Sequence, residues 1–321
     1  MGQTLSEPVT SKETNQYGNN SLLVSSSCMQ GWRIHMEDAH TGYLNLPSDK
    51  SASYFGVFDG HGGTKVAQYA GNNLHKLLTA QAEYEKGDLP EAIRKSFLAL
   101  DQNMLEDKEV RDELAGSTGI IILMKDNNIY CGNAGDSRAV ASVGGRAVSL
   151  SHDHKPSIQA ERERIISAGG WVDWNRVNGN LALSRALGDF VFKKNTKRTA
   201  EEQIVTANPD VIVKEKNDDY EFIIMACDGI WDVLTNQEVI NFIRQRIANG
   251  LDPTHICEEL MMRCLAPDCQ NSGLGCDNMT VLLICFLNDQ PYEALQQKCS
   301  TNPFTNKSDS EILEQSFGAL E

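Results

Sequence analysis

The sequence predicts an α+β fold in which antiparallel strands are combined with pairs of amphipathic helices. Apolar residues recur at helical spacing over two early stretches, 64–79 and 88–106. A second helix pair is expected later, over 236–248 and 253–264. Between the pairs, β-branched runs within 117–150 are joined by tight turns, which is typical of antiparallel hairpins. With 321 residues, 40% of them apolar, the chain is long enough to form a full core.

The chain starts with a polar stretch, and we expect residues 1–20 to form a flexible lead. The sequence Met1-Gly2-Gln3-Thr4-Leu5-Ser6 fits the myristoylation pattern, in which a hydroxyl residue follows Gly2 by four positions. An unmodified polar start is the alternative. One acyl chain gives only marginal membrane affinity, and Lys12 is the sole basic residue in this stretch. We therefore expect at most weak, reversible membrane association.

The main domain is expected over 21–288. Its strands are predicted at 22–29, 54–58, 117–124, 128–133, 138–143, 147–150, 221–226 and 281–287. Residues 151–192 contain a short helix ending near Ala168 and several turns, and we interpret them as an irregular flap over the sheets. A charged, exposed loop should follow over 193–205. Residues 289–321 form a polar tail for which we favour disorder. The alternative is a short amphipathic helix that is capped by Ser308 and Glu311 and carries Ile312, Leu313, Phe317 and Leu320.

Three predicted strands end in an aspartate beside a glycine. These pairs are Asp59-Gly60, Gly135-Asp136 and Asp228-Gly229. Glycine lets a backbone approach a ligand closely, and carboxylate and carbonyl oxygens suit a hard cation such as Mg²⁺ or Mn²⁺. A glycine-rich hairpin turn is the alternative for any one of these sites. The threefold repeat favours a shared metal site.

Further acids lie close to other predicted strands. Glu37 and Asp38 follow Arg33 closely, and Asp277 precedes the last strand. If the strand ends converge, four to six carboxylates share one cleft, where mutual repulsion would force protonation unless cations were bound. Taken alone, the run from Arg33 to Asp38 is more typical of a solvated surface patch.

Such a cluster suits phosphoester hydrolysis. Two metal ions about 4 Å apart can share a water, lower its pKa and hold it for in-line attack on phosphorus. Arg33 carries the forked donors that phosphate oxygens need. His61 has a pKa range suited to protonating the leaving alkoxide.

Composition excludes several classes of protein. The net charge of −15 argues against a nucleic-acid binder, which would show a basic face. Nine cysteines occur without CxxC or zinc-type spacing, so we expect no disulfide framework, and a reducing intracellular compartment fits best. We interpret the proximity of Cys264, Cys269 and Cys276 as packing or chance. No apolar run approaches the roughly 18 residues of a membrane span, and no signal peptide is evident.

Seven motifs, in order, resemble those of the metal-dependent type 2C protein serine/threonine phosphatases (the PPM family) of eukaryotic type. They are Arg33-x-x-Met-Glu37-Asp38, Phe58-Asp-Gly-His-Gly-Gly63, Gly135-Asp-Ser-Arg138, Asp153-His-Lys-Pro156, Ser184-Arg-Ala-Leu-Gly-Asp189, Cys227-Asp-Gly-Ile-Trp-Asp232 and Asp277-Asn278. The resemblance covers roughly residues 20–288. It implies a β-sandwich of two antiparallel sheets flanked by helix pairs, with the metal site at one edge.

The resemblance also implies a mechanism and a set of site residues. A water bridging two Mg²⁺ or Mn²⁺ ions would attack phosphoserine or phosphothreonine directly, without a phosphoenzyme. The implied metal ligands are Glu37, Asp59, the Gly60 carbonyl, Asp228 and Asp277, with Asp59 bridging both ions. Arg33 would grip the phosphate, and His61 would protonate the leaving oxygen. The supporting residues implied are Asp38, which would hold a water on a metal, Asp136 and Asp232 for a weaker third ion, and Arg185 on the substrate side.

This interpretation leads to expectations about partners and location. We expect phosphoprotein substrates, a role in signalling, no nucleic-acid binding and a monomeric protein. The expected location is cytoplasmic, with nuclear and reversibly membrane-bound locations left open. A catalytically silent relative that acts as a scaffold is one alternative, although all the metal acids are present. Another two-metal phosphoester enzyme, such as a nuclease, is a second, which the acidic net charge disfavours.

Overall fold

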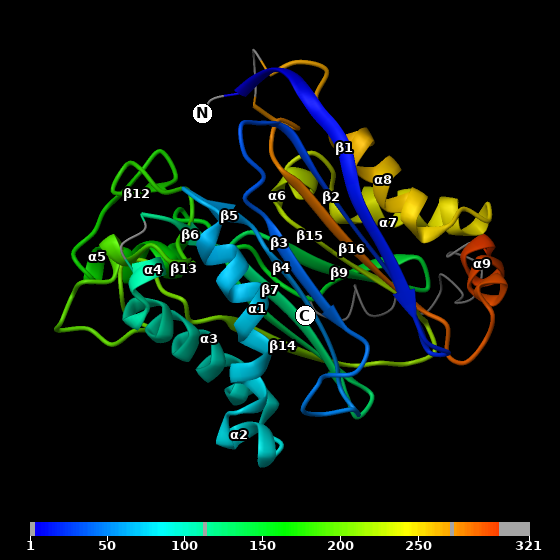
Figure 1. Cartoon of the computed structure of the whole chain (residues 1–321), viewed down its shortest axis with the longest axis horizontal. Coiled ribbons are helices and arrows are strands. Elements are labelled where there is room, and N and C mark those ends of the chain that lie inside the picture. The colour runs from blue at the N-terminus through cyan, green and yellow to red at the C-terminus, as the bar shows by residue number, and fades with distance from the viewer. Residues whose placement is uncertain (1–3, 112–113, 270–272, 302–321) are drawn as a thin grey trace, which may run out of the picture.

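The computed structural model describes residues 4–111, 114–269 and 273–301. Two antiparallel sheets pack face to face at its centre, and helices cover both outer faces (Figure 1). The helices of residues 65–111 lie on one side, and those of residues 228–300 lie on the other. The predicted sandwich flanked by helix pairs is therefore confirmed.

The strands of the described residues form two large and two small sheets. The first large sheet runs in the order β1 (Thr4–Gly18), β2 (Leu22–Arg33), β16 (Met279–Phe286), β15 (Tyr220–Ala226), β9 (Arg138–Val143) and β10 (Arg146–Ser149). The second runs β14 (Asp210–Glu215), β8 (Asn128–Ala134), β7 (Gly119–Lys125), β4 (Ser53–Phe58) and β3 (Ala39–Tyr43). The small sheets are β13 (Leu187–Gly188) with β6 (Gly116–Ser117) and β5 (Gly60–His61), and β11 (Val172–Asp173) with β12 (Arg176–Val177).

The four long helices lie where the apolar periodicity predicts them. The early helices are α1 (Lys65–Thr79), α2 (Ala82–Glu85), α3 (Leu89–Glu106) and α4 (Lys108–Arg111). The later ones are α5 (Gln159–Ser167), the 3₁₀ turn η1 (Phe190–Phe192), α6 (Asp228–Trp231), α7 (Asn236–Ala248), α8 (Pro253–Cys264) and α9 (Tyr292–Ser300). Local caps set several of these starts. The side chain of Asp88 accepts from the backbone of Glu91 at the start of α3, and Thr235 forms a capping box with Glu238 at α7.

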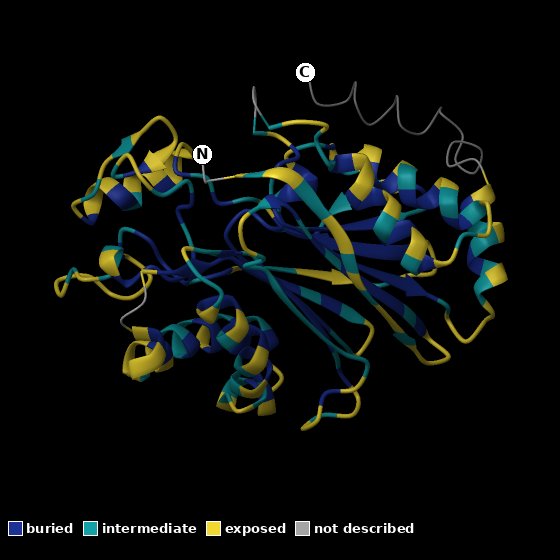
Figure 2. Ribbon diagram, turned by 45° about the horizontal axis from the view of Figure 1, so that its top comes forward, coloured by how far each residue is buried: buried dark blue, intermediate teal, exposed yellow. Residues whose placement is uncertain are grey.

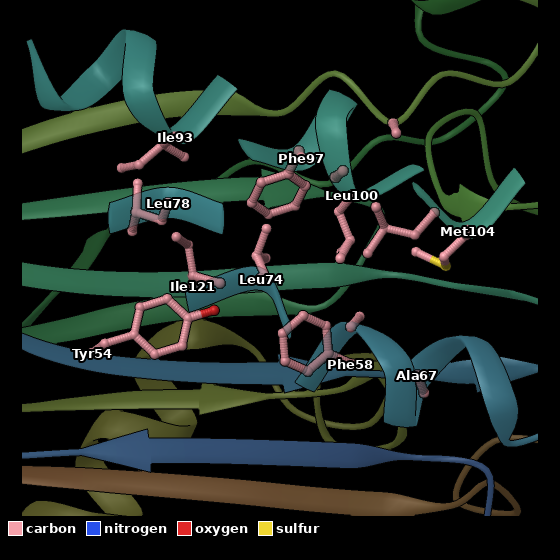
Figure 3. Close-up of a cluster of buried hydrophobic side chains, with 14 of the residues drawn as sticks. Tyr54, Phe58, Ala67, Leu74, Leu78, Ile93, Phe97, Leu100, Met104 and Ile121 are labelled. Atoms are coloured by element: carbon pink, nitrogen blue, oxygen red, sulfur yellow. The ribbon is translucent and has the colours of Figure 1, made fainter. Parts of the chain in front are cut away.

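Apolar side chains fill the space between the sheets and the space under each helix layer. Figure 3 shows the cluster beneath α1 and α3, where Tyr54 and Phe58 of β4 meet Leu74 of α1 and Phe97 of α3. Figure 2 shows buried residues concentrated in the central strands and exposed residues on the outer helix faces. The strand ends are thus anchored by packing on both sides of each sheet.

The prediction of a flexible lead over 1–20 is wrong for residues 4–18. These residues form β1, which pairs with β2 along the edge of the first sheet. Most side chains of β1 are exposed or half-buried, so the strand lacks the apolar alternation of a core strand. Backbone pairing and polar contacts hold it instead, including the bond from the Thr14 hydroxyl to Glu258 (2.7 Å).

The C-terminal tail contains a docked helix that the sequence did not predict. Helix α9 packs on α7, where Leu295 and Cys299 are buried. Arg244 of α7 donates to the carbonyl of Lys298 (3.0 Å). The expectation of disorder from 289 onward is therefore wrong for 292–300, because two buried side chains outweigh a polar composition. The alternative helix, capped by Ser308, lies outside the described residues.

The segment 151–192 contains α5, a short hairpin and turns. Its apolar side chains form a small separate core that includes Ile165, Val177 and Leu183. In the following loop, residues 196–202 are exposed, as predicted. Lys193 departs from the prediction, because its side chain is only 8% exposed and forms an ion pair of 2.8 Å with Asp101. In the part of the chain that the structure describes, no helix is long and apolar enough to cross a bilayer.

The cysteine pattern contains one pair that the sequence analysis did not recognise. Cys269 and Cys276 form a disulfide, and the other seven cysteines are free. The interpretation of Cys269 and Cys276 as neighbours by packing or chance is therefore wrong. Gly275 adopts a positive φ of 73°, and the turn there returns Cys276 toward Cys269.

Candidate active site

An open cleft of about 690 Å³ lies where strands of both large sheets end. The acids that line it are Glu37, Asp59, Asp136, Asp228 and Asp277. Arg33 and His61 also line the cleft, and the flap contributes Leu183 among other apolar side chains. The predicted convergence of acidic strand ends is thus observed.

Asp59 follows β4 directly, and two hydrogen bonds hold its backbone. Its N–H donates to the Thr118 hydroxyl (3.0 Å), and its carbonyl accepts from the Thr118 N–H (2.9 Å). At the next position, a Cβ on Gly60 would lie 2.3 Å from the carbonyl oxygen of Glu37. Only glycine permits this approach, which brings the segment of Glu37 beside Asp59.

Asp228 and Asp136 reach the cleft from the ends of two other strands. Asp228 follows β15 and opens α6, whereas Asp136 follows β8. One carboxylate oxygen from each of Asp59, Asp136 and Asp228 lies within 4.8 Å of the other two. Asp38, Asp59 and the thiol of Cys227 form a second such group. Two groups of donor atoms that share Asp59 are thus present.

Asp277 lies just before β16 and forms an ion pair with Arg33. The neighbouring Asn278 ties this region together, because its amide accepts from the Glu37 N–H (2.9 Å) and donates to the carbonyl of His35 (2.9 Å). Sequence reasoning noted Asn278 only as part of a motif and missed its positioning role. Asp232 caps the C-terminus of α6 and lines a neighbouring groove instead of the cleft.

The electrostatics of the cluster fit a bound hard cation. Burial, together with repulsion from neighbouring carboxylates, raises the pKa of both Asp59 and Asp228 well above the usual range. Burial also raises the pKa of Asp38 to about 6. In the described part of the chain, Oδ1 of Asp38 is buried without a hydrogen-bond partner. A divalent cation or its hydration water would relieve both the repulsion and the unpaired oxygen.

His61 is paired with an acid that the sequence analysis did not assign to it. Its Nε2 lies 2.7 Å from Oδ2 of Asp189, which lies in the flap. Burial lowers the pKa of His61, but the charge and hydrogen bond of Asp189 outweigh it, so the pKa is raised overall. Asp189 occurs in a family-like motif, yet no local pattern connects it with a histidine 128 positions away.

Arg185 lies outside the cleft, which corrects its predicted place on the substrate side. Its guanidinium forms ion pairs with Glu161 (2.7 Å) and Asp210 (2.8 Å), and only 14% of its side chain is exposed. It therefore anchors the flap to the sheet. The motif around Arg185 predicted that this residue lies near the site, but it could not predict that the side chain turns away from the cleft.

Comparison with known proteins identifies the family. The family model described as "Protein phosphatase 2C" matches residues 22–273. The chain belongs to the protein phosphatase 2C family. A probable protein phosphatase 2C of Caenorhabditis elegans is 60% identical over 300 residues, covering 94% of this chain and 84% of the relative. Protein phosphatase 2C homolog 2 of Hypocrea jecorina is 48% identical, covering 91% of this chain and 69% of the relative.

Solved structures agree with this protein phosphatase 2C assignment. A phosphatase from a pathogenic strain of Toxoplasma gondii is similar with a TM-score of 0.72 and 26% identity, covering 86% of this chain and 96% of that one. The predicted family and fold class are confirmed. As a family member, the chain is a protein phosphatase and hence a hydrolase.

Proposed function

We propose that this protein phosphatase 2C hydrolyses phosphoserine and phosphothreonine in proteins at a site holding two divalent cations. The observation that carries the proposal is the meeting of Asp59, Asp136 and Asp228 within 4.8 Å in a cleft that also contains Arg33 and His61. Half-buried and buried carboxylates this close together are stable only when protonated or bound to cations. Phosphoester hydrolysis of this kind uses carboxylates that are bound to cations.

The oxygen donors support Mg²⁺ or Mn²⁺ as the cations. The residues that would hold them are Glu37, Asp59, the Gly60 carbonyl, Asp228 and Asp277. When bound, two such ions would lower the pKa of a coordinated water and so supply the nucleophile for in-line attack on phosphorus. Asp38 would accept a hydrogen bond from a coordinated water through its unpaired Oδ1. Asp136 and, more distantly, Asp232 would serve a weaker third ion.

The remaining steps belong to side chains of the cleft. Arg33 offers its guanidinium donors to the phosphate oxygens, which fixes the phosphorus in line for attack. His61 donates a proton to the departing serine or threonine oxygen. Because water attacks phosphorus directly, no covalent phosphoenzyme forms.

We infer that the substrates are phosphoproteins and that the protein acts as a cytoplasmic monomer, with weak membrane association if Gly2 is acylated. The seven free cysteines support a reducing compartment. The Cys269–Cys276 disulfide is the one feature that is more typical of an oxidising compartment. Size-exclusion chromatography with light scattering tests the monomer. Mass spectrometry of the N-terminal peptide from cells tests the acylation.

The first experiment measures phosphate release from a phosphothreonine peptide with EDTA, and then with Mg²⁺ or Mn²⁺ added back. We expect turnover only with added metal, and a loss of at least about 100-fold in Asp59→Asn, because a shared ligand is removed. Asp218→Asn is the matched control and should retain activity, because Asp218 lies in an exposed turn at the opposite end of β15 from Asp228. Turnover in EDTA would reject the metal site, and a folded but inert wild type would reject the substrate class.

A further inference from the structure

The pair formed by His61 and Asp189 stands at the border between the cleft and the flap. The Nε2–Oδ2 distance is 2.7 Å, and the side chains are 30% and 5% exposed, respectively. Both residues line the cleft. In the described part of the chain, Nδ1 of His61 has no hydrogen-bond partner, so this nitrogen is available to a substrate.

The backbone around Asp189 is held from two sides. Its N–H donates to the carbonyl of Ala115 (3.0 Å), next to the pairing of β13 with β6. The N–H of the preceding residue, Gly188, donates to the carboxylate of Asp101 in α3 (2.8 Å). The same carboxylate forms an ion pair with Lys193 (2.8 Å). Asp189 itself adopts a left-handed conformation, with φ 51° and ψ 38°. Such a conformation persists only where the surroundings hold it.

Gly116 makes room for the pair. It lies in β6, between the strand that carries His61 and the strand that precedes Asp189. A Cβ at this position would lie 2.2 Å from Oδ2 of Asp189 and 2.5 Å from Nε2 of His61. Any side chain here would push the two residues apart.

We propose that Asp189 is a positioning residue that orients the His61 imidazole so that Nδ1 faces the leaving oxygen of the substrate. The proposal rests on the proposed phosphatase function, in which His61 is the proton donor. Asp189 accepts the hydrogen bond from Nε2–H and fixes the ring, as carboxylates orient histidines in other hydrolases. It touches neither the phosphate nor the leaving group.

The proposed step balances without a further reactant. Water adds to phosphorus as the bond from phosphorus to the serine or threonine oxygen breaks. The leaving oxygen takes the bond's electron pair and a proton from Nδ1, and His61 later regains a proton from solvent. An aliphatic alkoxide is a poor leaving group that needs this proton, whereas a nitrophenolate leaves without it.

The test therefore compares Asp189→Asn with wild type on a phosphothreonine peptide and on p-nitrophenyl phosphate, both with saturating Mn²⁺. We expect kcat on the peptide to fall about 10- to 100-fold, which is less than the loss typical of removing the proton donor itself. KM should stay within about twofold of the wild-type value. The rate with p-nitrophenyl phosphate should fall less than about threefold. A purely structural loss would lower both rates together.

Four further variants, one of them a control, sharpen the result. Gly116→Ala keeps both side chains but separates them, and should show the same selective loss. His61→Gln should show it more strongly, and adding Asp189→Asn to His61→Gln should cost nothing further. Asp210→Asn is the matched control, because Asp210 also pairs with a histidine, His154 (3.1 Å), but lies outside the cleft. Asp210→Asn should not lower the rate on the peptide more than the rate on p-nitrophenyl phosphate.

A measurement without metal or substrate completes the test. In the metal-free protein, ¹H NMR should show a downfield imidazole N–H that disappears in His61→Gln, Asp189→Asn and Gly116→Ala, while thermal melting checks that each variant is folded. Equal losses on both substrates, or an additive double mutant, would overturn the role of Asp189. If His61→Gln itself shows no selectivity, the proton-donor role falls and the positioning role falls with it. If wild type is inert on both substrates, the failure lies in the proposed function.

Discussion

At the scale of single residues, Glu161 shows how a buried charge is retained. Its carboxylate accepts from Arg164 (2.8 Å), Arg185 (2.7 Å) and the Ser184 hydroxyl (2.6 Å), and its side chain is 4% exposed. Burial alone would raise the pKa of Glu161, but the two guanidinium groups outweigh it and lower the pKa to about 2. The network joins α5 to the flap segment that leads to Asp189.

The lowered pKa gives a pH-dependent prediction. Because the folded pKa lies below the unfolded value of about 4.3, the stabilisation is complete above that pH and is lost as the pH falls toward 2. Glu161→Gln should lower the free energy of unfolding at pH 7 by about 3 kcal/mol, since it leaves two guanidinium groups unpaired. Urea unfolding in EDTA at pH 7 and pH 3 should show a smaller difference at pH 3.

The neighbouring exposed Glu163 supplies the control, and Glu163→Gln should change stability by less than about 0.5 kcal/mol at either pH. An equal loss for Glu161→Gln at both pH values would contradict the assignment, because the effect would then come from packing and not from charge.

At the scale of elements, β1 is the strand that the polar sequence of residues 4–18 does not predict. Tyr17, near its end, packs against the core between the sheets, and a Cβ on Gly42 of β3 would lie 1.7 Å from the Tyr17 hydroxyl. Burial raises the pKa of Tyr17 to about 12. One aromatic side chain thus links the edge of the first sheet to the edge of the second.

Removing this link should loosen the sandwich. We expect Tyr17→Ala to lower the free energy of unfolding by about 2 kcal/mol, below the range for a fully buried aromatic, because Tyr17 is only partly buried. Tyr17→Phe keeps the ring and should have little effect. Urea unfolding of the three proteins measures the difference, and similar losses in both variants would show that the hydroxyl, not the ring, is responsible.

At the scale of the whole molecule, the acids that the metal site needs for activity lower the stability of the metal-free protein. Asp59 comes from one large sheet and Asp228 from the other, so their repulsion acts across the sandwich. Both folded pKa values are raised well above the unfolded value near 3.9, first through burial and then through repulsion from neighbouring carboxylates, chiefly Asp38 and Asp228 for Asp59 and Asp136 and Asp277 for Asp228. For a carboxyl group this sign means that stability is lost as the pH rises from about 4 through the raised folded pKa.

We therefore expect Asp228→Asn to stabilise the metal-free protein at pH 7 by about 1–3 kcal/mol while it removes phosphatase activity. Thermal melting in EDTA and in Mg²⁺ tests this. Wild type should melt higher with Mg²⁺, because binding to the folded state adds stability, and the variant should respond much less. A variant that melts below wild type in EDTA would contradict the repulsion.

The sequence by itself determined the family, the fold class and most elements. Helical periodicity located α1, α3, α7 and α8, since it depends only on residues three and four positions apart. Strand ends marked by glycine and aspartate located the acids of the cleft for the same local reason. Ordered motifs then supplied the chemistry that those acids share.

Only the tertiary structure decided which groups meet. Asp189 reaches His61, Arg185 turns away from the cleft, and Lys193 is buried against Asp101, each through packing between segments distant in sequence. The polar strand β1 is held by pairing with a neighbour and not by its own apolar pattern. Local sequence determines what a segment can form, whereas the direction and partner of a side chain depend on what else is packed around it.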